Sequence, residues 1–172
     1  MKMKVIVMLA AFALTASVAS AQELPRKVQN VEVLDLDGKP VKLPYFGEKN
    51  LMIFYVDPDR HKQNEDFTIE LEQNHRAESD NIYGFGVMNL KDAPMIPNGM
   101  ARNMAKKRTE KNGATVLADQ NRILSTAWGL GDCNNQFVLM IVSKEGELVF
   151  LRKGVLSDAD KKAFYATIDK YK

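Results

Sequence analysis

The sequence has a single cysteine, Cys133, and only two histidines among its 172 residues. One cysteine cannot form a disulfide within the chain, so no disulfide framework is expected and no cysteine pair exists for dithiol chemistry. Two histidines and loosely spaced carboxylates also match none of the usual ligand spacings of metal sites. These absences leave a protein for which we predict no resident metal and no cofactor.

Long apolar runs are absent except near the N-terminus. Lys2 and Lys4 precede an apolar segment over residues 5–18, and Ala19-Ser20-Ala21 has the small-x-small form of a cleavage site. The pattern predicts a signal peptide over residues 1–21, a mature chain starting near Gln22, and a periplasmic or secreted location. The apolar segment is too short and too poorly flanked for a membrane span, so none is expected in the mature chain.

An excess of charge is also absent. Subtracting Lys2 and Lys4 from the 24 basic residues leaves 22, against 22 acidic residues. A neutral balance excludes the class of nucleic-acid binders that hold phosphates through a basic excess. Removing 21 of 172 residues leaves 151, a size that predicts one domain over residues 22–172.

Strand-like and helix-like segments alternate along the mature chain. Apolar β-branched runs indicate strands, and Pro97, Gly113 and the Ser157-x-x-Asp160 motif mark helix ends. Alternation of this kind implies parallel strand pairs joined by right-handed crossovers, with the last hairpin as an antiparallel edge. We therefore predict a three-layer α/β sandwich around a mixed sheet. The expected elements are a hairpin over 31–43, a strand over 51–56, a helix over about 63–79, a strand over 82–90, a helix over 97–111, a strand over 115–119, a short helix over 122–128, a hairpin over 137–154 and a helix from 157.

Several segments resemble a known superfamily. The order of elements, with FYVDPDRHK after the first buried strand and MIVSKEGELVF before a final helix, resembles the thioredoxin-like superfamily over residues 31–172. MIPNGMARNMAKK, ATVLADQNRILSTAWGL and VLMIVSKEGELVFLRKGVLSDAD are more closely similar to the periplasmic YtfJ family. The resemblance implies a thioredoxin-like sandwich with a mixed central sheet and an N-terminal β-hairpin extension.

The chain departs from this resemblance at the chemical centre. Aligning FYVDPDRHK with the thioredoxin pattern places Asp59, Arg60, His61 and Lys62 where the two cysteines and their spacer would lie. Phe137 falls where such proteins carry a cis-proline beside the active site. Both parts of the dithiol machinery are missing, so the resemblance implies a degenerate active site.

The segment from Asp57 to Lys62 is the main candidate for binding a ligand or partner. It follows a buried strand and precedes a helix, the place where α/β sheets usually bind ligands. In the simpler interpretation, Asp59 caps the helix and Pro58 shapes the turn. An alternative is a metal carrier that uses Asp57, Asp59 and His61.

Three methionines, Met95, Met100 and Met104, extend that alternative, because thioethers can bind Cu(I). Methionines at helical spacing are more typical of core filling, and we expect that role here.

Cys133 is the candidate catalytic residue of a second alternative, a single-cysteine thiol oxidoreductase or peroxidase-like enzyme. It lies in a polar turn beside Asp132, whose carboxylate would raise the thiol pKa and lower its reactivity. The same turn is expected to border the active-site corner, where Arg60 or His61 would have the opposite effect. A peroxidatic cysteine would be expected at the helix start after FYVDP, and Cys133 is not there.

Charge is segregated between two predicted helices. The helix over 63–79 is acidic and the helix over 97–111 is basic, and a solvated face is the default interpretation of each. The basic helix is also the best candidate for docking an acidic partner or an anionic surface. The main hypothesis is a non-enzymatic exported protein that binds an unidentified protein or small molecule of the bacterial envelope.

Overall fold

The computed structural model describes residues 23–172, so the predicted signal peptide lies outside the described residues. A mixed sheet contains eight strands in the order β1-β8-β7-β4-β5-β6-β2-β3. Its centre is parallel, because β4 pairs with β5 and β5 with β6, whereas β7 is antiparallel to β4 and β8 to β7. These strands are β4 (Asn50–Val56), β5 (Ile82–Asn89), β6 (Val116–Asp119), β7 (Phe137–Val142) and β8 (Glu147–Lys153).

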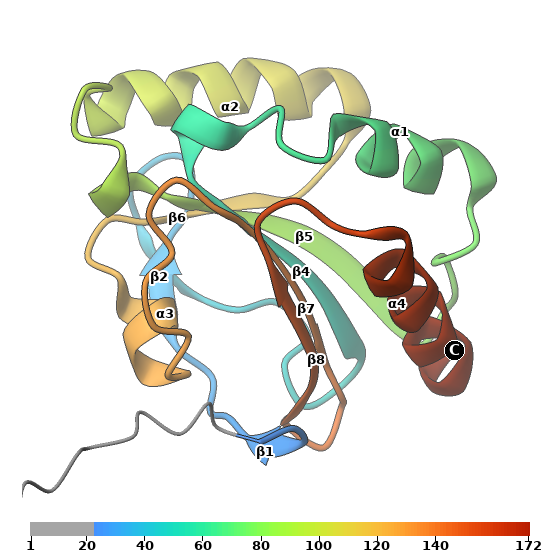
Figure 1. The fold of residues 1–172 in the computed structure, drawn as a ribbon. Coiled ribbons are helices and arrows are strands. Elements are labelled where there is room, and N and C mark those ends of the chain that lie inside the picture. Colours follow the sequence, from blue (N-terminus) through green and yellow to red (C-terminus); the bar gives the residue numbers. More distant parts are fainter. Residues whose placement is uncertain (1–22) are drawn as a thin grey trace, which may run out of the picture.

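Helices cover both faces of the sheet, which confirms the predicted three-layer α/β architecture (Figure 1). The helices α1 (Glu65–Asn74), α2 (Asn98–Asn112) and α4 (Asp158–Tyr171) pack on one face. The short α3 (Ile123–Ala127) lies on the other. Two 3₁₀ turns, η1 (Pro58–Arg60) and η2 (Leu90–Asp92), follow the carboxyl ends of β4 and β5.

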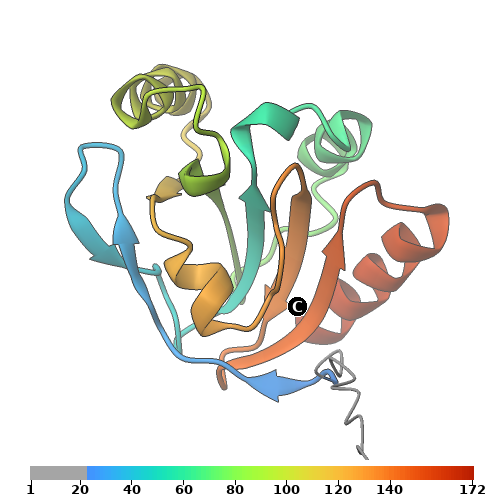
Figure 2. The same ribbon diagram turned by 60° about the vertical axis from the view of Figure 1, so that its left-hand side comes forward.

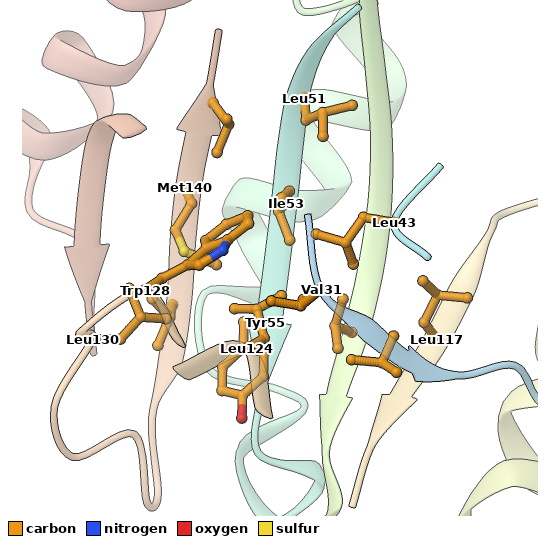
Figure 3. Close-up of a cluster of buried hydrophobic side chains, with 14 of the residues drawn as sticks. Val31, Leu43, Leu51, Ile53, Tyr55, Leu117, Leu124, Trp128, Leu130 and Met140 are labelled. Carbon is orange, nitrogen blue, oxygen red and sulfur yellow. The ribbon is translucent and has the colours of Figure 1, made fainter. Parts of the chain in front are cut away.

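The largest core cluster lies between α3 and the sheet (Figure 3). Ile53 and Tyr55 are two residues apart on β4, so both side chains point into this layer, and both are buried. Trp128 follows α3 and is also buried, and its indole N–H donates to the carbonyl of Gln29 at 2.8 Å. That bond satisfies the polar atom of the ring and holds the N-terminal segment against the sheet.

The two predicted hairpins and the final helix are confirmed. β2 (Glu32–Leu34) and β3 (Pro40–Lys42) pair around Gly38, whose φ of 84° suits a residue without Cβ. This hairpin extends the sheet because Leu34 pairs with Ala118 of β6. Ser157 caps α4 in a complete capping box with Asp160.

Two features differ from the sequence prediction by more than one or two residues at an element end. The helix predicted over 63–79 ends at Asn74, because His75 adopts the left-handed conformation and the Asn74 side chain accepts the N–H of Arg76 at 2.8 Å. The short β1 (Arg26–Lys27) pairs with β8, so the last hairpin does not form the sheet edge. Within residues 23–172, no helix is long and apolar enough to cross a membrane.

Candidate functional site

The corner between β4 and α1 is organised by Asp57. Its side chain is fully buried and accepts the backbone N–H of Asp59 at 2.9 Å and of Asn135 at 2.7 Å. Asp57 therefore caps η1, and the expectation that Asp59 is the cap is wrong. An N-cap side chain accepts the free N–H groups of the first turn, which follow it in the sequence. Asp57 can do this because its own backbone is extended just before η1.

The loop that leads into β7 is held against this corner by the same kind of contact. The N–H of Asp57 donates to the carbonyl of Gln136 at 3.1 Å, and the side chain of Gln63 accepts the N–H of Phe137 at 2.8 Å. Phe137 is buried. Among the described residues the only cis peptide is Leu24–Pro25, so the bond before Phe137 is trans. The N–H of Asn135, the carbonyl of Gln136 and the N–H of Phe137 are thus all hydrogen-bonded to residues of the corner.

Four predicted site residues form an exposed surface, which we call the exposed corner: Asp59, Arg60, His61 and Lys62. The ring Nδ1 of His61 lies 2.9 Å from the carbonyl of Pro58. The side chains of this corner point to solvent with both signs of charge, next to the buried Asp57. The structure therefore separates the predicted site into a structural residue, Asp57, and four accessible ones.

Cys133 is buried, with 2% of its surface exposed, and its thiol lies 3.6 Å from the carbonyl of Gly131. Burial raises the pKa of the Cys133 thiol, Lys153 lowers it, and Asp92 and Asp132 raise it further, so the net shift is upward. The cations that affect this pKa are Lys153 and Arg122 rather than Arg60 or His61. The thiol is therefore protonated at neutral pH and shielded from reagents.

Lys153 of β8 holds the turn that contains Cys133 in place. Its ammonium group donates to the carbonyls of Leu130 and Asp132, the latter at 2.8 Å. These two bonds hold the turn against β8 and keep the thiol side facing the core.

A buried polar cluster at the carboxyl ends of the parallel strands was not predicted from the sequence. The Asp119 carboxylate at the end of β6 accepts the N–H groups of Ile123 at 2.8 Å and Leu124 at 2.9 Å, and the Tyr55 hydroxyl lies 3.3 Å away. Burial raises the pKa of Tyr55 above its usual range, so the hydroxyl stays neutral and donates. The sequence signal that could have indicated this cluster is Asp119 itself, an aspartate four residues before a short apolar helix, because aspartates near a helix start often accept its free N–H groups.

Asp92 and Arg122 form an ion pair that connects the ends of β5 and β6. The guanidinium Nε donates to the Asp92 carboxylate at 2.8 Å and Nη2 donates to the same oxygen, while Asn89 donates at 2.5 Å. Burial raises the pKa of Asp92, but the hydrogen bonds from Arg122 and Asn89 outweigh it, and the net pKa is lowered. The pair stabilises the loop that leads into α2.

The methionines lie on the surface, which contradicts the expectation of core filling. Met95 is 86% exposed, and Met100 and Met104 are exposed on α2. The helix carries Lys107 and Lys111 on the same side, and their charge would repel a bound cation. Over residues 23–172, no group of three or more histidine, cysteine, aspartate or glutamate side chains is arranged to hold a metal ion.

Comparison with known proteins gives the fold. No protein-family model matches the chain, and no curated protein matches it. The structure is similar to the exposed lipoprotein thioredoxin of Streptococcus pneumoniae, with a TM-score of 0.56 and 20% identity over 83% of this chain and 99% of that chain. It is also similar to a peroxiredoxin-like protein from Aquifex aeolicus, with a TM-score of 0.62 and 12% identity over 88% of each chain.

A third similar structure is the thioredoxin domain of a thiol-disulfide oxidoreductase from Bacteroides vulgatus, with a TM-score of 0.55 and 15% identity. That alignment covers 85% of this chain and 95% of the other. The predicted thioredoxin-like fold is confirmed by these likenesses. At such low identities they concern the fold and not the activity.

Proposed function

We propose that this chain is an exported accessory protein of the bacterial envelope, related to the YtfJ family, that binds a protein or small molecule through the exposed corner. The main support is the pair Asp59 and Lys62, which are exposed and which the sequence resemblance aligns with the two cysteines of thioredoxins. Dithiol exchange needs one thiolate to attack and a second to resolve the mixed disulfide. Neither side chain can do either, while both can form ion pairs and hydrogen bonds.

Cys133 supports the same proposal. A thiol that is buried, has a raised pKa and lies behind a turn held by Lys153 is a poor nucleophile. A single-cysteine oxidoreductase is the competing function, since thiol-disulfide oxidoreductases share this fold. It would require local opening of the turn that covers the thiol.

The first experiment separates these two functions. The chain starting at Gln22 and its Cys133→Ser variant are assayed for insulin reduction and for disulfide isomerisation of scrambled ribonuclease. The expected result is no turnover by either protein. Turnover that disappears in Cys133→Ser would replace the binding proposal with the single-cysteine enzyme.

The second experiment tests the exposed corner. A photo-crosslinking amino acid is introduced at Arg60 in exporting cells, with Lys162 of α4, which is also exposed, as the matched control position. A discrete crosslinked product is expected from position 60 only, and it should be lost when Asp59 and Lys62 are both changed to Ala. Equal products from both positions would remove the corner as a binding site. N-terminal sequencing of the exported protein tests processing before Gln22.

A further inference from the structure

The outer surfaces of α1 and α2 carry exposed apolar side chains. Ile69 on α1 is 45% exposed, and Met100 and Met104 on α2 are 56% and 61% exposed. Of the 15 residues of α2, only Ala101 is buried. A helix of this length with so little burial and two exposed methionines has an uncovered outer face, which is typical of an interaction surface.

The two helices lie side by side on the same face of the sheet and run in the same direction (Figures 1 and 2). Their C-terminal ends border one groove of about 530 Å³, with Glu72 of α1 on one side and Asn112 of α2 on the other. Met52, Ile82 and Gly84 form part of its lining.

The rotation of α2 about its axis turns Met104 away from the β2–β3 hairpin. Lys106 pairs with Asp37 of the β2–β3 hairpin at 2.7 Å, and the Arg102 guanidinium is near Gly38 of the same turn. A helix turns about 100° per residue, so Met104 and Lys111 lie on the opposite flank from Arg102 and Lys106. That flank faces α1.

The two helices have opposite charge. α1 carries only acidic side chains among its charged residues, and α2 is basic apart from Glu110. A two-fold axis running along the groove would place α1 of one copy against α2 of the other, twice in the same interface. Each contact would join an acidic helix with a basic one around apolar side chains, which is electrostatic complementarity between identical surfaces. The acidic residues are Glu65, Asp66, Glu70 and Glu72, and the basic ones are Arg102, Lys106, Lys107, Arg108 and Lys111.

We propose that this face binds a second copy of the chain in a symmetric dimer. With both C-terminal ends at the groove, Glu72 of each copy would lie near Lys111 of the other, and the exposed side chains of Ile69 and Met104 would lie in the same interface. An anionic lipid surface fits the same face less well, since it would attract α2 but repel α1 beside it. The dimer proposal does not rest on the function proposed for the exposed corner, although that corner precedes α1 directly and borders the same face.

Charge reversal on each helix tests the proposal. One variant carries Lys107→Glu and Lys111→Glu on α2, and the other carries Glu72→Lys and Gln73→Lys on α1. Sedimentation equilibrium should show a dimer for the parent chain, and the dimer dissociation constant of each variant should rise at least about tenfold. Mixing the two variants should restore a heterodimer, because both of its contacts again join opposite charges.

The controls keep the result interpretable. Lys144→Glu with Lys162→Glu makes the same change of net charge as the α2 variant, but away from the two helices, and should leave dimerisation unchanged. Circular dichroism checks that each variant is folded. If the α2 variant does not fold, the dissociation constant of the α1 variant alone tests the proposal. A monomeric parent chain, or a mixture of variants that stays monomeric, would overturn the proposal. So would a monomer that binds phosphatidylglycerol vesicles through Lys107 and Lys111.

Discussion

Phe164 lies at the centre of the contact between α4 and the sheet. Its side chain has no exposed surface, and its ring makes edge-to-face contacts with Phe67 at 5.4 Å and Phe150 at 5.8 Å between ring centroids. Changing Phe164 to Ala removes the buried ring and leaves a cavity that the three surrounding elements cannot close. The free energy of unfolding should fall by about 3–5 kcal/mol. For a domain of this size the melting temperature should then fall by roughly 6–20 °C.

The measurement is urea unfolding followed by circular dichroism, with the slope of the transition fitted separately for each variant. Tyr171→Ala is the matched control, because Tyr171 lies seven residues after Phe164 on the same side of α4 but is only partly buried. Its loss should be about 1 kcal/mol or less. Equal losses for the two variants, or a Phe164→Ala loss below about 1 kcal/mol at unchanged slope, would refute the assigned packing of α4.

Three further predictions concern the polar residues near the carboxyl ends of the strands. Asp57→Asn should lower the free energy of unfolding by about 1–3 kcal/mol, because only one amide oxygen remains for two backbone donors, whereas Asp59→Asn should change it by less than about 0.5 kcal/mol. The lowered pKa of Asp92 contributes stability above the unfolded-state value of about 4 that is lost as pH falls through the folded-state pKa. Acid titration of Asp92→Asn should therefore show a smaller loss of stability in that pH range than the parent chain shows. Cys133 should react with a thiol reagent at least about tenfold more slowly in the native chain than in urea, since burial raises its pKa and blocks access. A native rate equal to the rate in urea would contradict this burial.

Local features of the fold could be predicted because short stretches of sequence determine them. The Ser157–Asp160 capping box acts within one helical turn, and Gly38 supplies the positive φ of a tight hairpin turn. Alternating apolar strands and helices limited the topology through the handedness of crossovers. The start of α2 after Pro97 and its end at Gly113 follow from the same local chemistry.

The roles of individual site residues depended on contacts between distant parts of the chain. Asp57, rather than Asp59, became the buried cap because Asn135, which is 78 residues away, donates to its second oxygen. Helical spacing placed Met100 and Met104 on one face of a helix, and only the packing of α2 decided that this face points to solvent. Sequence spacing indicates which side chains share a face of a helix, but not whether that face packs on the protein or is exposed to solvent.

For Cys133 as well, its neighbour Asp132 indicated the direction of the pKa shift, but the largest cause is burial beneath a folded turn. Desolvation depends on every atom around the thiol, and those atoms come together only in the tertiary structure.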